Sequence, residues 1–204
     1  MLIGLTGRAG AGKDTCALRL GALWRAGEGD LASLFPRGVT RIAFADALKL
    51  SAMASLGITS REYALRLADE LKVNGTITVK VGLAEWTVSG REFFQLAGYE
   101  GGRLIHGEDV WIDAVLPLSI ELSDDTLYVV TDVRFDNEAQ RIVDLGGEVF
   151  EILGRSEDGV KGHPSEAGVA RELIATTIDN SVEDDMEALD TQLVSALRRQ
   201  HAHI

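Results

Sequence analysis

The sequence predicts an α/β protein whose mostly parallel central sheet is covered by helices on both faces. Short apolar runs of strand length alternate with stretches of helical periodicity, which is typical of a parallel sheet in a three-layer α/β/α fold. A glycine-rich segment lies between the first strand and the first helix. With 204 residues and 46% hydrophobic content, the chain can bury one sizeable core, so we expect a single domain over 1–204.

The individual elements follow in order along the chain. Residues 2–6 form an apolar run that predicts a buried strand, and Cys16, Leu20 and Leu23 keep helical spacing within residues 15–25. Further strand-length runs occupy residues 39–44, 126–130, 148–153 and 175–178, and helical stretches follow at 46–56, at 137–145 and at the C-terminal end. Ligands of such sheets bind outside the carboxyl ends of the strands, so we expect the site there.

One segment departs from this alternation. Residues 76–81 and 86–88 alternate apolar and polar side chains around Gly82 and follow a helical stretch at 60–72. This pattern predicts a β-hairpin inserted at about 73–89. The hairpin either shapes a substrate pocket or is a solvent-facing edge.

Charge and composition exclude several classes of protein. Twenty basic against 32 acidic residues leave a net charge of −12, which argues against binding along a nucleic-acid polymer. No run of 18 apolar residues and no secretory signal occurs, so we expect no membrane association and a cytoplasmic location. The single cysteine, Cys16, fits a reducing compartment.

The glycine-rich segment carries the strongest chemical signal. Residues 7–13, GRAGAGK, match the GxxxxGK pattern of a phosphate-binding loop. Backbone amides around Gly10, Ala11 and Gly12 can converge on phosphate oxygens, and Lys13 can reach the outer phosphates of ATP. A merely flexible turn is the alternative.

The next two residues indicate a metal-dependent nucleotide site. Asp14 stands where a serine or threonine usually offers its hydroxyl to Mg²⁺, and a carboxylate is a hard oxygen ligand suited to that ion. An acidic residue favoured by the helix N-terminus is the alternative for Asp14. Thr15 can contact an inner phosphate. Because no guanine-reading NKxD stretch occurs, a small kinase is the class that fits best.

Two groups of cations could bind a second anion. Arg91 and Gln95 lie four residues apart in a helical stretch and so share one face, and Arg103 follows a glycine break at 101–102. Asp132 and Arg134 follow the strand at 126–130, where Asp132 could hold Mg²⁺ and Arg134 could bind phosphate in a bidentate manner. A solvated helix face and a local ion pair are the respective alternatives.

Taken together, the motifs resemble a known family. The segments GRAGAGKDT, FADALKLSA, SGREFFQLAGYEGGR, EDVWI, VVTDVRFDNEAQRIVDLGGEVFEI, GHPSEAG and IDNS are similar, in this order, to the deoxynucleoside monophosphate kinases of tailed bacteriophages. The resemblance covers nearly the whole chain. Its specific parts are the GKDT ending and the RxxxQ helix followed by a strand and DxR.

The resemblance implies a P-loop kinase fold and a phosphotransferase that moves the γ-phosphate of ATP to a deoxynucleoside monophosphate (dNMP) with Mg²⁺ as cofactor. It implies that Arg91, Gln95 and Arg134 hold the acceptor and that Asp46 and Lys49 border the same pocket. For a phage protein, the cytoplasm would be that of the host.

Further expectations are less specific. Arg155 begins a polar segment, 154–166, that is either a lid whose arginine reaches the donor phosphates or an ordinary surface loop. Trp111, near the arginines, is the tryptophan to test for base stacking, although packing is the commoner role. The alternative functions are a kinase of another small acceptor, such as dephospho-coenzyme A, and an ATP-binding switch that transfers nothing. A homodimer is left open.

Overall fold

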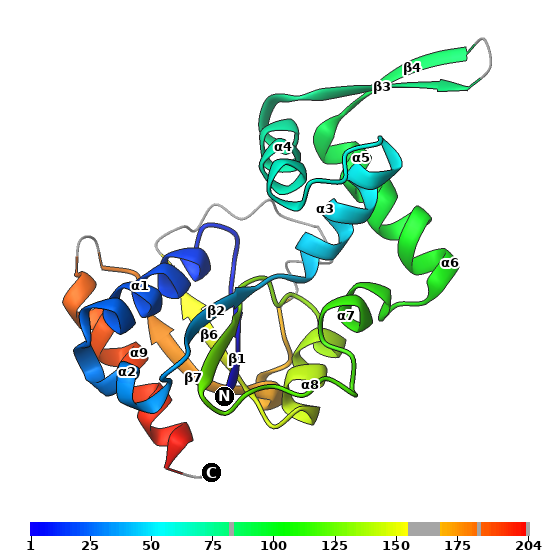
Figure 1. The fold of residues 1–204 in the computed structure, drawn as a ribbon. Helices are drawn as coiled ribbons and strands as arrows, with labels where there is room; N and C mark the ends of the chain where they lie inside the picture. The colour runs from blue at the N-terminus through cyan, green and yellow to red at the C-terminus, as the bar shows by residue number, and fades with distance from the viewer. Residues whose placement is uncertain (82–83, 155–167, 183–184, 203–204) are drawn as a thin grey trace. The chain divides into compact units, whose positions relative to one another are not determined.

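The computed structural model describes residues 1–81, 84–154, 168–182 and 185–202 (Figure 1). The chain forms two compact units. The first, called here the sheet unit, comprises Met1–Ala43 and Leu116–Ile204. The second, called the inserted unit, comprises Phe44–Val115 and enters the chain between two strands of the sheet unit. A single domain over 1–204 stays a prediction.

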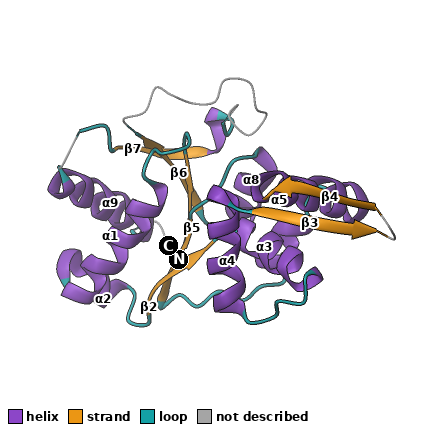
Figure 2. Cartoon of the chain, turned by 90° about the horizontal axis from the view of Figure 1, so that it is seen from above, coloured by secondary structure: helices purple, strands orange, loops and turns teal. Residues whose placement is uncertain are grey.

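A five-stranded parallel sheet forms the centre of the sheet unit (Figure 2). Its strands are β1 (Leu2–Thr6), β2 (Gly38–Ile42), β5 (Thr126–Val130), β6 (Glu148–Leu153) and β7 (Ile174–Asp179). They are ordered β2-β5-β1-β6-β7, and every neighbouring pair is parallel. Since β1 lies in the middle, the segments that follow β5 and β6 leave the sheet beside the segment that follows β1.

Helices cover both faces of this sheet, which confirms the predicted fold class (Figures 1 and 2). On one face lie α1 (Lys13–Ala26), α2 (Leu31–Leu34) and α9 (Met186–His201), and on the other lies α8 (Asp136–Asp144). Among the described residues, the unit also has two short 3-10 turns, Glu28–Asp30 and Arg171–Leu173. Ile3 and Leu5 of β1 are fully buried and cluster with apolar side chains of α1 and α9. All five residues of β1 are buried, because both faces of the sheet are covered, and this explains why β1 is an uninterrupted apolar run.

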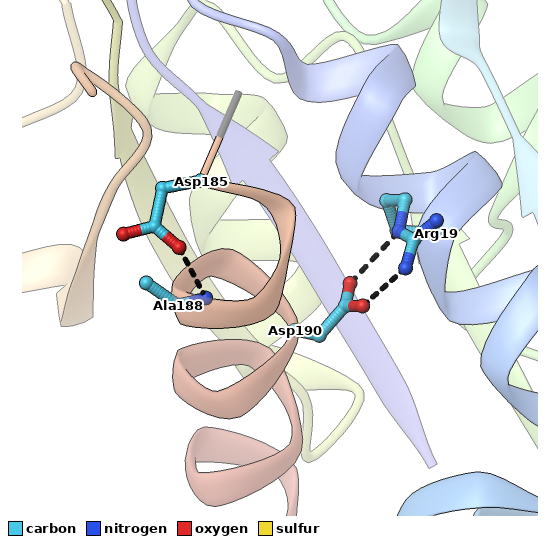
Figure 3. A network of polar contacts seen from close by, with 4 residues as sticks. All are labelled: Arg19, Asp185, Ala188 and Asp190. Atoms are coloured by element: carbon cyan, nitrogen blue, oxygen red, sulfur yellow. Dashed lines mark hydrogen bonds and ion pairs between the residues drawn. The ribbon is translucent and has the colours of Figure 1, made fainter. Parts of the chain in front are cut away.

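Polar contacts fix α9 against α1 (Figure 3). The Arg19 guanidinium donates to both carboxylate oxygens of Asp190, with Nε 2.9 Å from Oδ1. Asp185 caps the start of α9 by accepting a hydrogen bond from the Ala188 amide at 2.9 Å. The Arg19–Asp190 contact thus joins α9 to α1, the helix that begins at the end of the glycine-rich loop.

The inserted unit is mainly helical and has a core of its own. Its elements are α3 (Phe44–Ser55), α4 (Arg61–Asn74), β3 (Thr76–Val81), β4 (Ala84–Ser89), α5 (Gly90–Gly98), a π-helix η2 (Tyr99–Arg103), α6 (Leu104–His106) and α7 (Val110–Val115). Met53, Ala68 and Phe94 are buried in one cluster contributed by α3, α4 and α5.

The predicted hairpin is confirmed as β3 and β4, which pair antiparallel with Ile77 opposite Val88. Those two side chains are buried, whereas Trp86 is half exposed. A pocket-shaping role for the hairpin stays a prediction, and the expected lid lies outside the described residues apart from Gly154. Among the described helices, none combines the length and the apolar character needed to cross a membrane.

The backbone differs from the prediction at Gly101–Gly102. The sequence predicts a glycine break there, but the chain continues as the π-helix η2 into α6. A Cβ atom on Gly102 would lie only 2.4 Å from the Trp111 ring, so this glycine allows a close approach of the two segments and does not end the helix. The strand expected at 39–44 is also shorter, because Phe44 already belongs to α3.

Candidate functional site

The glycine-rich loop at residues 7–12 joins β1 to α1 at the carboxyl edge of the sheet. Gly7, Gly10 and Gly12 have φ angles of +135°, +78° and +95°, which residues with a side chain rarely adopt. Helix α1 starts at Lys13, so the first amides of that helix lack intrahelical partners and carry the positive end of its dipole. The loop and the start of α1 therefore have a backbone geometry suited to an anion, and anion binding stays a prediction. Within the loop, the Ala11 N–H donates to the Arg8 carbonyl oxygen at 3.1 Å.

The back of this loop packs tightly on the end of β6. A Cβ atom on Gly7 would lie 2.4 Å from the Ile152 carbonyl oxygen, and one on Gly154 would lie 2.2 Å from the Cα atom of Ala11. The Ala11 side chain is itself buried. Neither position has room for a side chain, so Gly7 and Gly154 allow the loop to lie directly against the end of β6.

Asn180, which follows β7, contacts the same loop. Its side-chain amide donates to the Ala11 carbonyl oxygen at 2.9 Å, and its backbone N–H donates to the Leu153 carbonyl oxygen at 2.8 Å. Asn180 lies in the IDNS segment that contributes to the family resemblance, but the sequence analysis gives this residue no role. Its place directly after a strand at the carboxyl edge of the sheet could have identified it.

Lys13 lies over the loop that precedes it. Its Nζ donates to the carbonyl oxygens of Gly7 at 2.7 Å and Arg8 at 2.9 Å. The pKa of Lys13 is lowered, chiefly because the ammonium is partly buried and next because of the positive charge of Arg134. The carboxylates of Asp14 and Asp132 act in the opposite direction. A bound anion would supply the negative charge that this ammonium needs.

The end of β5 brings Asp132 and Arg134 within electrostatic range of Lys13. Val133 between them is fully buried, which leaves the two charged residues accessible, as the predicted alternation requires. The buried carboxylate of Glu138 accepts hydrogen bonds from the backbone N–H groups of Arg134 at 2.7 Å and Phe135 at 3.2 Å. Glu138 thus fixes the backbone that carries Arg134, a role that a glutamate in the first turn of α8 could have suggested.

Asp14 and Thr15 are exposed in the first turn of α1. The Asp14 carboxylate lies 3.5 Å from the guanidinium of Arg41 at the end of β2. No group of three or more His, Cys, Asp or Glu side chains able to hold a metal occurs in the part of the chain that the structure describes. A site built from Asp14 and Asp132 would therefore need further oxygen ligands from water or from a bound nucleotide.

A second group of predicted residues lies in the inserted unit. Ser89 caps α5 by accepting a hydrogen bond from the Glu92 amide at 3.2 Å, and Arg91 and Gln95 follow on the exposed side of this helix. Phe94 lies in the core of the unit. The two polar side chains are one helical turn apart, so they can contact one ligand together.

The π-helix η2 carries Arg103, whose side chain is mostly buried and lies 3.7 Å from the Glu108 carboxylate. Trp111 of α7 donates its indole N–H to the Gly98 carbonyl oxygen at 3.0 Å, and its ring lies against Gly102. These contacts pack α7 against the end of α5 and against η2. A base-stacking role for Trp111 stays a prediction.

Helix α3 carries Asp46 and Lys49. The Lys49 ammonium is mostly buried and lies 2.8 Å from the Asp69 carboxylate of α4 and 3.8 Å from that of Asp46. Two carboxylates thus already balance its charge within the inserted unit.

The predicted site residues fall into two sets, one in each unit. The sheet unit carries the loop residues Gly10, Ala11, Gly12, Lys13, Asp14 and Thr15 together with Asp132 and Arg134. The inserted unit carries Asp46, Lys49, Arg91, Gln95, Arg103 and Trp111. Arg155 lies outside the described residues.

Over 106 residues the chain is 30% identical to the deoxynucleoside-5'-monophosphate kinase of Escherichia phage T5. The chain is related to a kinase. The match covers 48% of this chain and 42% of the relative, so the chain spans less than half of that kinase's length. No protein-family model matches the chain.

Proposed function

We propose that the protein is an ATP-dependent kinase that phosphorylates deoxynucleoside monophosphates to diphosphates. The observation that carries this proposal is the glycine-rich loop between β1 and α1, whose glycines have positive φ angles. The loop packs on the end of β6, and Lys13 follows it directly. Such a loop is suited to a polyphosphate. The name of the phage T5 relative supports the acceptor class.

The donor nucleotide is assigned to the sheet unit. Amides around Gly10, Ala11 and Gly12 bind the phosphate chain, while Thr15 contacts an inner phosphate. The Nζ of Lys13 gives up its hydrogen bonds to the loop carbonyls and contacts the transferring phosphate. The negative charge of this phosphate favours the ammonium form of Lys13. Arg155 is proposed as a further contact to the donor.

Asp14 and Asp132 are proposed to hold Mg²⁺ together with the nucleotide. The donor set fits this ion, since Mg²⁺ is commonly bound by one or two carboxylates and completes its shell with water and substrate phosphates. Asp14 is in the first turn of α1, directly after the loop, and Asp132 follows β5, the strand that pairs with β1. Both carboxylates act to raise the pKa of Lys13. When bound, the ion neutralises charge on the phosphates. Arg41 offsets part of the negative charge of Asp14.

The acceptor is assigned to cations outside the loop. Arg91 and Arg134 bind its phosphate, and Gln95 hydrogen-bonds its base. Arg103, Asp46, Lys49 and Trp111 are proposed to border the same acceptor.

The reaction needs no nucleophile from the protein. An oxygen of the acceptor phosphate attacks the γ-phosphorus of ATP, the bond between that phosphorus and the β–γ bridging oxygen breaks, and ADP leaves. The attacking oxygen is already anionic, so the side chains contribute positioning and charge neutralisation. Lys13, Arg91 and Arg134 are the cations that neutralise the developing charge.

A panel of acceptors tests the proposal. Purified protein with ATP and Mg²⁺ is offered each dNMP, each ribonucleoside monophosphate and dephospho-coenzyme A, and ADP release is measured. We expect turnover with at least one dNMP. The Lys13→Ala variant should lose about 100-fold or more of this turnover, because it removes a cation from the transferring phosphate. The control variant Lys72→Ala, at an exposed lysine near the end of α4, should turn over normally.

Two results would contradict the proposal. Turnover restricted to dephospho-coenzyme A would reassign the acceptor. Tight ATP binding without product on every acceptor would instead identify an ATP-binding switch.

A further inference from the structure

Asn180 connects the end of β7 to the glycine-rich loop, and the proposed reaction does not yet use it. Its backbone N–H extends the pairing of β6 and β7 by donating to the Leu153 carbonyl oxygen at 2.8 Å. The half-buried side chain is thereby held beside the loop, where it donates to the Ala11 carbonyl oxygen at 2.9 Å.

The donor and the acceptor of this hydrogen bond are fixed by the chemistry of the two groups. A carbonyl oxygen can only accept, so the atom that contacts Ala11 must be the amide nitrogen of Asn180. The contact also explains the residue at position 12. A Cβ atom on Gly12 would lie 2.2 Å from that amide nitrogen, so a side chain there would displace Asn180.

The hydrogen bond sets the orientation of the peptide between Ala11 and Gly12. In a trans peptide the C=O and N–H groups point in opposite directions. Since the Ala11 carbonyl is directed to Asn180, the N–H of Gly12 points away from it. Asn180, Ile152 and Gly154 all contact the loop from the ends of β6 and β7. The Gly12 N–H is therefore directed away from the side on which the loop is packed.

Such a peptide needs an external restraint. A flip of the peptide changes the φ of the residue that follows it, and a glycine accepts both signs of φ at little cost. Without Asn180, the peptide before Gly12 could reverse and direct a carbonyl oxygen, instead of an N–H group, at a bound phosphate. An orientation of this kind is lost without any large change in the fold.

We propose that Asn180 is a positioning residue that holds the Gly12 N–H ready to bind the polyphosphate of the donor. The proposal rests on the donor half of the proposed function, but it requires neither transfer nor an acceptor. Inorganic tripolyphosphate, which carries the phosphate chain without base or sugar, is therefore the appropriate probe.

Two variants separate orientation from charge. Asn180→Ala removes the donor without adding charge, and Asn180→Asp keeps the shape but replaces the donor with an acceptor. Calorimetry with tripolyphosphate and Mg²⁺ should give a Kd about tenfold weaker for both, the size expected for one lost hydrogen bond. The melting temperature without ligand should stay close to that of the wild type. Asn74→Asp, at the exposed end of α4, is the matched control and should bind as the wild type does.

The affinities of the two Asn180 variants decide whether the proposal holds. Wild-type affinity in Asn180→Ala would overturn the proposal, and so would a loss confined to Asn180→Asp, since charge repulsion would then explain it. If Asn180→Asp does not fold, Asn180→Ala decides alone. In turnover, Asn180→Ala should raise the KM for ATP and leave the KM for the acceptor unchanged, a split that general loss of structure would not produce.

The same measurements keep the two proposals apart. A wild-type protein that fails to bind tripolyphosphate would overturn this inference together with the assigned donor site. If the wild type binds tripolyphosphate and Asn180→Ala binds it weakly, while no acceptor is phosphorylated, the kinase proposal fails and the role of Asn180 stands.

Discussion

At the scale of single residues, the first turn of α1 contains two titratable side chains that differ in their surroundings. Lys13 lies over the loop, where partial burial lowers its pKa and nearby carboxylates oppose that change. Cys16, three residues later, is fully buried in the core behind the loop. Burial raises the pKa of its thiol from 9.0 to about 12. The lysine can respond to an anion, whereas the cysteine is a small core residue.

The raised pKa of Cys16 predicts a pH effect on stability. Above pH 9 the thiol of the unfolded chain loses its proton, while the folded thiol keeps it up to about pH 12. The native state then binds more protons than the unfolded state, so the free energy of unfolding falls as pH rises through this window. The slope contributed by one proton is about 1.4 kcal/mol per pH unit.

Urea unfolding of wild type and Cys16→Ala at pH 8, 9 and 10 measures this effect. Subtracting the two stabilities removes the contributions of Lys13 and of every other shared group. The free energy of unfolding of the wild type minus that of Cys16→Ala should be constant below pH 9 and should decrease above pH 9. Parallel curves up to pH 10 would show that the folded thiol titrates normally.

At the scale of elements, local signals predict the structure where local forces determine it. Strand β6 spans Glu148–Leu153 as expected, because two glycines separate it sharply from α8. Helix α1 begins at Lys13, before the predicted residue 15, because Gly12 caps it ahead of the first apolar side chain. The π-helix η2 could not be predicted, since it depends on the tertiary contact of Gly102 with Trp111.

The candidate site follows the same rule. The loop at 7–13 and the pair Asp132 and Arg134 could be predicted, because each set follows one strand directly. Arg41 could not be predicted as a partner of Asp14, because this contact depends on which elements are neighbours in space. Asn180 directly follows β7 and so was a candidate by position, but its contact with the loop depends on the strand order. Sequence periodicity identifies strands but does not give their order, here β2-β5-β1-β6-β7.

Helix α5 carries its own prediction. Arg91→Ala should raise the KM for the dNMP by roughly 10- to 100-fold, the range expected when a charged hydrogen bond to phosphate is lost. The KM for ATP should change little. Because Arg91 is exposed and the core residue Phe94 is untouched, the variant should fold normally. Initial rates with each substrate varied in turn measure both constants.

A second arginine supplies the control for this variant. Arg66 is exposed on α4, where its guanidinium lies over the ring of Tyr63 at 5.5 Å. Arg66→Ala removes the same charge from the inserted unit and should leave both constants unchanged. An acceptor KM that is equal in wild type and Arg91→Ala would remove Arg91 from the acceptor site.

At the scale of the whole molecule, the division into two units could not be predicted from the sequence. Its boundaries, Ala43/Phe44 and Val115/Leu116, fall without a proline- or glycine-rich linker that would indicate them. The sequence predicts only the hairpin as an insertion, because the hairpin alone changes the hydrophobic period. Helices α3, α4 and α5 have ordinary helical periodicity. They are recognised as part of a separate unit because they share a core of their own.

The two units give the proposed function a prediction for the whole chain. Each ligand should slow hydrogen exchange mainly in the unit that supplies most of its contacts. At a ligand concentration 100 times its Kd, amides that open only when the ligand leaves should exchange about 100-fold more slowly. We expect a non-hydrolysable ATP analogue with Mg²⁺ to protect the loop and α1. A dNMP should protect α5 and η2.

Arg91→Ala makes this measurement specific. The variant should lose the protection of α5 by dNMP and keep the protection of the loop by the ATP analogue, because the loop contacts lie within the sheet unit. Mass spectrometry of peptides from both units reads the two effects in one sample. Protection by dNMP confined to the sheet unit, in wild type as in the variant, would show that Arg134 and its neighbours bind the acceptor without α5. The acceptor residues would then have to be sought entirely at the carboxyl edge of the parallel sheet.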